Sequence, residues 1–253
     1  MNIKEEINIL IGIDDTDNAE SRGTGFHSRQ LAHQLESAGH AVVKGITRHQ
    51  LFLDPAIRYT SRNSSACIDL QTDDLNLITA ICEKYLIENS ARGSDAGLCI
   101  ATDKDINHAI IEWGKSAKTE VLYMEDAIAL AKEKAIYLRG FTGTHEGIIG
   151  ALAAVGLRFG GNDGRFIWRK GKKELREMEA GIIDVQQLKT ELGLDAIESL
   201  NGEIPGSGDK IYINEWVRPI LKNNKTILIA EKTENNDEYE WKLTAKEVIR
   251  TIS

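Results

Sequence analysis

Three aspartates within four positions, Asp14, Asp15 and Asp17, directly follow an apolar segment in the run ILIGIDDTDN. Strand alternation sends Asp15 and Asp17 to the same side. Mg²⁺ in proteins prefers one or two carboxylates together with phosphate oxygens and water. The pattern therefore predicts a metal site at these three aspartates. The alternative is an acidic turn closed by Asx hydrogen bonds.

Two glycine-rich turns could hold the phosphates of a nucleotide. Residues 23–25 (GTG) and residues 143–147 (GTHEG) each open an expected helix, and backbone N–H groups at a helix N-terminus bind anions. His145, in the second turn, is a candidate for proton transfer or phosphate contact, or else a polar helix cap. The residues expected to bind the nucleotide in and near these turns are Thr16, Gly23, Thr24, Gly25, Gly143, Thr144 and Gly147.

Arg48, Arg58 and Arg62 lie close together in the sequence, in TRHQ, IRYT and SRNS. Arginine is suited to bidentate recognition of phosphate or carboxylate. The alternative is that these side chains lie over the surface of loops. A later basic run, residues 165–176, contains Phe166 and Trp168; such a run can contact RNA but is more typical of a solvated hairpin face.

The bulk composition narrows the classes of function. A net charge of −8 over 253 residues argues against a general nucleic-acid binder. The longest apolar run, residues 147–157, is shorter than the roughly 20 residues of a membrane helix, and Glu5 and Glu6 do not suit a secretory signal. We therefore expect a cytoplasmic protein without a membrane partner. The three cysteines, Cys67, Cys82 and Cys99, are too widely spaced for a zinc or disulfide framework and suit buried positions.

The hydrophobic pattern predicts an α/β (α+β) chain. Strand and helix signals alternate in the first half, with helices capped by Asp73 and Asp103. A small-residue helix after residue 143 is expected to pack tightly against a sheet. The expected strands are 8–13, 41–53, 65–70, 97–101, 135–138, 166–169, 210–217, 226–231 and 238–242, with hairpin tips at residues 223–224 and 235–236. The expected helices are 25–38, 73–87, 103–113, 124–134, 147–156, 184–192 and 245–252.

Four blocks in the same order resemble the archaeal tRNA(Ile) agmatidine synthetase family: IGIDDTDN…RGTG, TRHQLFLDPAIRYTSRNSSA, GSDAGL and GTHEGIIGALAAVG, within about residues 8–170. The resemblance implies a kinase-like ATP- and Mg²⁺-binding domain over residues 1–64 and 119–180. It further implies a ferredoxin-like subdomain over 65–118, before a strand-rich C-terminal region over 181–253. Asp14, Asp15 and Asp17 match the family's metal site and Arg62 matches its TRGN arginine, while Gly147 and Gly150 match its glycine helix. With His145, the aspartates and Arg62 are the expected catalytic residues, and Arg48 is expected to contact the nucleotide.

The chain also departs from this family. Residues 23–27 read GTGFH, where the family has a GMCTT-like turn with a phosphorylated threonine, and the cysteine spacing contains no zinc ribbon. We therefore expect an ATP- and magnesium-dependent phosphotransferase or ligase that acts on a small molecule or nucleoside. The alternatives are a tRNA-modifying enzyme that uses a partner's RNA-binding module, and a non-catalytic nucleotide-binding regulator. A homodimer is plausible, although no residue requires it.

Overall fold

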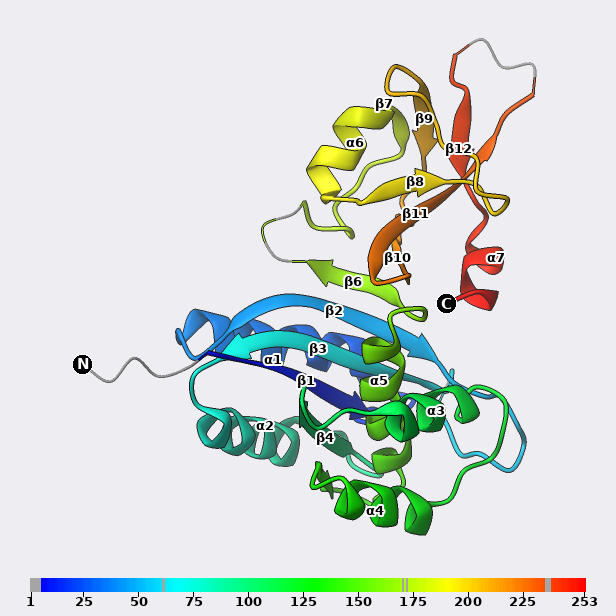
Figure 1. Cartoon of the computed structure of the whole chain (residues 1–253). Helices are drawn as coiled ribbons and strands as arrows, with labels where there is room; N and C mark the ends of the chain where they lie inside the picture. Colours follow the sequence, from blue (N-terminus) through cyan, green and yellow to red (C-terminus); the bar gives the residue numbers. More distant parts are fainter. Residues whose placement is uncertain (1–5, 61, 170, 172, 235–237) are drawn as a thin grey trace. The chain divides into compact units, whose positions relative to one another are not determined.

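The computed structural model describes residues 6–60, 62–169, 171, 173–234 and 238–253, and the chain forms two compact units, Met1–Gly160 and Gly161–Ser253 (Figure 1). Each unit combines a β-sheet with helices, as the mixed α/β pattern of the sequence predicts. Within the described part of the chain, no helix has the length and apolar character needed to cross a bilayer.

The first unit is built on an antiparallel sheet with the strand order β5-β4-β1-β3-β2. The strands are β1 (Ile7–Asp14), β2 (Val42–Gln50), β3 (Ser64–Thr72), β4 (Gly97–Thr102) and β5 (Tyr137–Gly140). The central strand β1 pairs with β3 and β4, so Gly12 lies between Cys67 and Cys99. The end of β1, and with it Asp14, is therefore enclosed by neighbouring strands.

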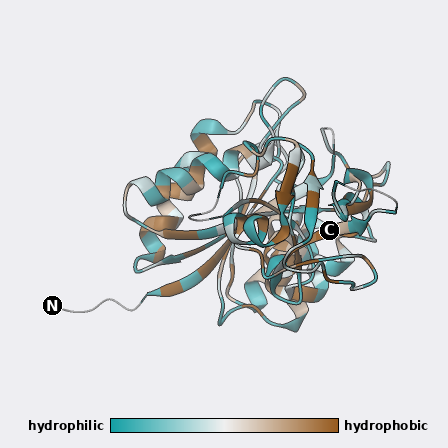
Figure 2. Ribbon diagram, turned by 90° about the horizontal axis from the view of Figure 1, so that it is seen from above, coloured by the Kyte–Doolittle hydropathy of each residue, from teal (hydrophilic) through white to brown (hydrophobic). Residues whose placement is uncertain are grey.

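Helices cover both faces of this sheet. Helices α1 (Thr24–Ser37) and α2 (Leu75–Asn89) lie on one face, and α3 (His108–Ser116), α4 (Met124–Glu133) and α5 (Gly147–Gly160) lie on the other (Figure 1). Figure 2 shows long hydrophobic stretches along the strands and an alternation of hydrophobic and hydrophilic residues along the helices. Because successive strand residues face opposite sides, both faces of β1 are buried.

Helix α5 lies directly against β1 and β4 because glycines leave room for it. A Cβ atom on Gly12 would stand 1.9 Å from the carbonyl oxygen of Ala151, and one on Gly97 would stand 2.2 Å from the carbonyl carbon of Gly147. The tight packing predicted for the small-residue helix is confirmed.

The second unit is strand-rich. Its sheet has the order β6 (Arg165–Arg169), β10 (Ile220–Lys222), β11 (Lys225–Lys232), β12 (Trp241–Leu243), β9 (Lys210–Ile213) and β7 (Gly181–Asp184), with β8 (Ala196–Glu198) parallel to β11. Helices α6 (Val185–Leu192) and α7 (Lys246–Thr251) complete the unit. Asn223 and Asn224, with φ values of 51° and 58°, form the predicted tip between β10 and β11. The other predicted tip, residues 235–236, lies outside the described residues.

Several predicted boundaries are wrong. Asp74 rather than Asp73 caps α2, accepting a hydrogen bond from the Leu77 amide at 3.0 Å. Helix α3 begins after Asn107, whose side-chain oxygen accepts a hydrogen bond from the Ala109 amide. Residues 103–106 lie before the helix, and there the Asp105 carboxylate accepts a hydrogen bond from the Thr102 amide. The short strands β7, β8 and β10 were not predicted, since three or four residues carry too little periodicity.

The three cysteines are buried and free, and burial raises the pKa of each thiol. Strands β3 and β4, from the segment expected to be ferredoxin-like, pair with β1 from the segment expected to be kinase-like. The two segments therefore share one sheet, and the proposed division into domains stays a prediction.

Replacement of Gly12 by alanine tests the contact between β1 and α5. The added methyl group would overlap the Ala151 carbonyl, so we expect Gly12→Ala to lower the free energy of unfolding by about 3 kcal/mol or to prevent folding. Gly181→Ala is the control, since a Cβ there meets no atom within 4 Å. Equal thermal midpoints for the two variants, measured by circular dichroism, would contradict the close approach.

Candidate functional site

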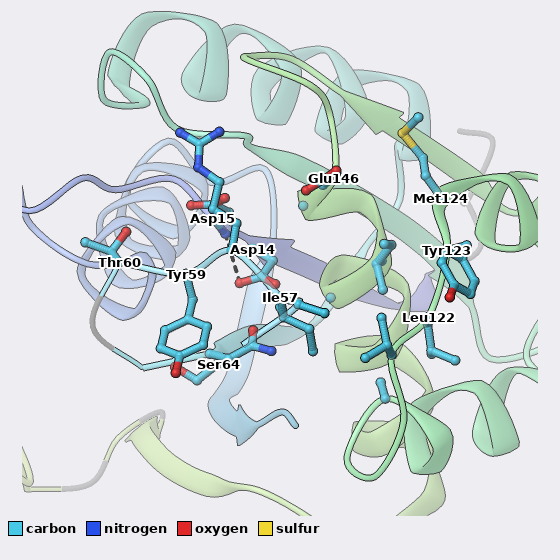
Figure 3. Close-up of a pocket in the computed structure, with 18 of the residues that line it drawn as sticks. Asp14, Asp15, Ile57, Tyr59, Thr60, Ser64, Leu122, Tyr123, Met124 and Glu146 are labelled. Atoms are coloured by element: carbon cyan, nitrogen blue, oxygen red, sulfur yellow. Dashed lines mark hydrogen bonds between the residues drawn. The ribbon is translucent and has the colours of Figure 1, made fainter. Parts of the chain in front are cut away.

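A pocket of about 390 Å³ lies in the first unit, where β1 ends (Figure 3). One wall consists of Asp14, Asp15 and Asp17 with Thr24 at the start of α1. The segment that connects β2 to β3 forms a second wall, and the start of α5 forms the floor, with Gly147 and Gly150. The remaining wall comes from residues 117–125. The pocket thus gathers acidic, hydroxyl, arginine and glycine residues from segments distant in sequence.

Asp14 is the most deeply enclosed acid of the pocket. A Cβ on Gly150 would stand 1.8 Å from its Oδ2 atom, so α5 is in direct contact with the carboxyl group. Its Oδ1 atom accepts a hydrogen bond from the Asp15 amide at 2.8 Å. Burial, followed by repulsion from Asp15 and Asp17, raises the pKa of Asp14 to about 8, although Arg48 opposes this shift. The environment of the carboxyl group therefore favours its protonated form.

Asp15 turns the chain out of β1. Its φ of 47° lies in the left-handed region, which costs free energy for a residue with a side chain. Burial raises the pKa of Asp15 to about 6; the Asp95 and Asp17 carboxylates add to this effect, and Arg58 opposes it. A strained backbone and a crowded carboxylate at the same position are typical of a functional site.

Asp17 is engaged by the first turn of α1. Its Oδ1 atom accepts hydrogen bonds from the Thr24 amide at 3.2 Å and the Thr24 hydroxyl at 3.1 Å. The buried hydroxyl of Thr16 lies 3.2 Å from the Thr24 hydroxyl. These contacts fix the turn after β1 against the N-terminus of α1.

Asp95 connects the segments around the pocket, and the sequence had given it no role. Its buried carboxylate accepts from the amide and hydroxyl of Thr144 and lies 3.3 Å from the Arg58 guanidinium. Its carbonyl oxygen accepts from the Gly147 amide at 2.9 Å. The sequence DAGLCIA could have indicated this role, because an aspartate directly precedes an apolar strand there. In β1 the order is reversed, and the aspartates follow the apolar strand.

The three arginines have different surroundings. Arg62 lines the pocket. Arg58 also lines it and donates to the Gly93 carbonyl at 3.2 Å as well as pairing with Asp95. Arg48 donates from Nε and Nη2 to the Ser64 hydroxyl, at 2.9 and 2.6 Å, and Ser64 lines the pocket.

Only some of the residues expected at the site line the pocket: Asp14, Asp15, Asp17, Thr24, Arg62 and Gly147. The others support it or lie beside it: Thr16, Gly23, Gly25, Arg48, Gly143, Thr144 and His145. His145 has a φ of 71°, and its Cβ lies against Gly140. Its catalytic role stays a prediction.

The wall formed by residues 117–125, which we call the far wall, differs in character from the aspartate wall. It is apolar at Leu122 and Met124. Ile57, on the segment that connects β2 to β3, adds an apolar side chain, and Figure 3 shows Tyr59 and Tyr123 on opposite sides of the pocket. Glu120, Glu125 and Glu146 place exposed carboxylates at its edge. In the described part of the chain, none of these three glutamates forms an ion pair.

The carboxylates do not form a complete metal site by themselves. Among residues 6–60, 62–169, 171, 173–234 and 238–253, no three histidine, cysteine, aspartate or glutamate side chains are placed to hold a metal ion together. The metal assignment of Asp14, Asp15 and Asp17 stays a prediction. The geometry favours the first two, because Asp17 is engaged by Thr24.

Solved structures with a similar fold include a tRNA fluorescent labelling enzyme (TM-score 0.53, 23% identity, 59% of this chain and 36% of that chain). They also include TiaS, an agmatidine synthetase for an isoleucine tRNA, in complex with that tRNA and ATP (0.53, 18%, 80% and 50%) and without ligands (0.52, 17%, 97% and 54%). The chain spans about half the length of TiaS. No protein-family model and no curated protein sequence matches the chain. The expected likeness to the agmatidine synthetase fold is confirmed.

The pH dependence of stability tests the environment of Asp14. In metal-free protein the pKa of the Asp14 carboxyl is about 8 in the folded state and 3.8 in the unfolded chain. Between about pH 4 and pH 8 the folded state therefore keeps a proton on this group that the unfolded chain has lost. Stability therefore falls as the pH rises from about 4 to 8.

Asp14→Asn removes this titration. We expect the variant to gain stability relative to wild type by up to about 4 kcal/mol between pH 5 and pH 8, measured by urea denaturation in EDTA. Asp103→Asn, at an exposed aspartate of the same unit, is the control. A constant difference for Asp14→Asn across this range would show that the carboxyl is not desolvated.

Asp95→Asn tests the connection between the pocket walls. An amide group cannot accept all the bonds that the carboxylate accepts, so we expect a loss of about 2 kcal/mol in stability. Amide hydrogen exchange at Thr144 and Gly147 should also become faster. Glu112→Gln, which removes only solvent-exposed pairs with His108 and Lys115, should leave both readouts unchanged. Unaltered exchange at Thr144 in Asp95→Asn would refute the proposed connection.

Proposed function

We propose that this chain is an ATP- and magnesium-dependent enzyme that modifies a nucleoside of tRNA. The observation that carries the proposal is the meeting of Asp14 and Asp15 with the glycines of α5 in one pocket. The shared fold supports it, since one of the similar structures is TiaS in complex with an isoleucine tRNA and ATP. A cytoplasmic location belongs to the same proposal.

The residues of the pocket suit Mg²⁺. Carboxylate oxygens are the ligands this ion prefers, and it takes one or two of them with phosphate oxygens and water. The buried carboxyl of Asp14, with its raised pKa, lacks a full countercharge, and a cation would replace its proton. Mg²⁺ held by Asp14 and Asp15 would neutralise charge on the phosphates of ATP.

The surrounding groups suit the phosphates. Gly147 and Gly150 leave the start of α5 without side chains where the pocket is deepest. Arg58 and Arg62 offer guanidinium groups on another wall of the pocket. Positioning and electrostatic stabilisation of this kind supply most of what phosphoryl transfer requires.

The far wall suits the base of an acceptor nucleoside. Its apolar side chains and Tyr123 would provide a surface for a planar ring, and Tyr59 lies on the opposite side of the pocket. Glu120, Glu125 and Glu146 at the edge repel phosphates. An RNA acceptor would thus insert its base here, while its backbone is held by cations outside the pocket.

Isothermal titration with ATP, with and without Mg²⁺, tests the nucleotide site. We expect Mg²⁺-dependent binding that weakens at least about tenfold in Asp15→Asn, because one carboxylate ligand loses its charge. Asp103→Asn should bind as wild type does.

The same proteins are then tested for ATP turnover with a tRNA transcript, with free nucleosides and with no acceptor. Turnover that requires tRNA is the expected result. Turnover with free nucleosides alone would replace the proposal by a small-molecule phosphotransferase, and ATP binding without turnover would indicate a regulatory nucleotide-binding protein. Binding unaffected by Asp15→Asn would place the nucleotide elsewhere.

A further inference from the structure

Three cationic side chains surround a single indole ring in the second unit. The Arg218 guanidinium carbon and the Lys246 ammonium nitrogen each lie 5.7 Å from the centroid of Trp216, and the Arg250 guanidinium carbon lies 6.0 Å away. Lys246 and Arg250 are four residues apart on α7 and therefore project from the same side of that helix. We call Trp216, Arg218, Lys246 and Arg250 the Trp216 cluster.

The protein holds this cluster in place. Trp216 packs against the buried group formed by Ile220, Ile227, Ile229 and Ile249. Arg218 donates from Nη1 to the carbonyls of Leu175 and Val217, at 3.3 and 2.6 Å. The side chains of Lys246 and Arg250 are half-buried. The cations are thus fixed by the fold rather than spread freely into solvent.

None of the three cations of the cluster forms an ion pair within the described residues. The ion pairs described in this unit involve Lys173, Lys222 and Lys242. No carboxylate of the described segments pairs with Arg218, Lys246 or Arg250, although Glu215 and Glu247 adjoin them in sequence. Burial and the nearby charge of Arg176 lower the pKa of Arg218, opposed by Glu174. Three cations about one ring repel each other, and an anionic ligand would relieve this repulsion.

The basic run expected to form a cationic face in this unit is used differently. Arg165 is buried and donates to the Ser253 hydroxyl at 3.2 Å. Arg169 donates to the carbonyls of Leu192 and Gly193 and lies over Phe166. Lys170 and Lys172 lie outside the described residues. The Trp216 cluster instead combines residues from two segments about 30 positions apart.

We infer that the Trp216 cluster is a docking surface for the phosphate backbone of RNA. Arginine and lysine beside an aromatic ring are the groups with which proteins bind nucleic-acid strands, and contacts to phosphates position the RNA without reading its sequence. The inference rests on the proposed function, in which the edge of the pocket is too acidic to hold the backbone. The chain has a net charge of −8, so non-specific attraction of RNA to the rest of its surface would compete little with binding at the cluster.

Binding of a fluorescein-labelled tRNA transcript between 50 and 200 mM KCl tests this inference. Glutamine removes the charge but keeps the aliphatic stem over the ring, so the variant is Lys246→Gln with Arg250→Gln. We expect its slope of log affinity against log salt to be smaller by about 1.5, and its affinity at low salt to fall roughly tenfold. Lys225→Gln, at an exposed lysine of β11, is the control and should match wild type in both.

ATP titration of the same variants separates this inference from the proposed function. Unchanged ATP binding with a reduced salt slope is the expected combination. Tight RNA binding with an unchanged slope in the double variant would overturn the docking surface and leave the proposed function standing. Absence of RNA binding by wild type that still binds Mg²⁺ and ATP would overturn both the docking surface and the tRNA substrate. Loss of binding to phosphatidylserine vesicles in the variant, with RNA binding unaltered, would assign the cluster to a membrane surface instead.

Discussion

The close approach of α5 to the central sheet is the constraint on which the site depends. Gly12 and Gly97 on the strands let the helix lie where a methyl group would overlap its carbonyls, and Gly150 brings it against the Asp14 carboxyl. A helix at the usual separation would leave water around Asp14, and its pKa would stay near the ordinary value. The packing that stabilises the core therefore also desolvates the acid, and Gly150 and Gly147 contribute no side chain to the pocket.

This packing makes the acids of the pocket depend on one another. The charges of Asp15 and Asp17 raise the pKa of Asp14, and those of Asp95 and Asp17 raise the pKa of Asp15. Arg48 opposes the first shift and Arg58 opposes the second. A buried carboxyl group without full compensation costs folding free energy, and a cation bound there would offset part of this cost by replacing the proton. Asp95 has the opposite character, since its carboxylate is satisfied by Thr144 and Arg58. Asp95 thus connects segments around the pocket, whereas the charges near Asp14 and Asp15 are only partly compensated.

Local pattern in the sequence was enough to predict β1, α5 and the aspartates between β1 and α1, because an apolar strand, a polar turn and a glycine-rich helix each have a short-range signature. The role of Asp95 could not be predicted, since it depends on Thr144 and Arg58, each more than 30 positions away. The observed N-cap residues of α2 and α3 lie one and four positions after the predicted ones. Several polar residues precede each helix, and tertiary packing decides which of them caps it. The prediction of a solvated face for the basic run at residues 165–176 is wrong at Arg165 for a related reason. The sequence shows that this residue is charged, but it does not show that its guanidinium group is buried.

The surfaces of the chain differ in charge, and we expect them to bind different groups of the ligands. Glu120, Glu125 and Glu146 are exposed acids of the pocket lining, whereas Arg58 and Arg62 are its basic residues, so in the proposed function the phosphates of the nucleotide would lie on the arginine side. A polyanionic acceptor that exposed its backbone to this edge would be repelled, whereas a base turned out of the strand would meet apolar and aromatic side chains. In the proposed function, the cations around Trp216 would supply the attraction that the pocket edge lacks. A net charge of −8 is compatible with an RNA substrate if the contact is confined to a few fixed cations and the chemistry to a single inserted base.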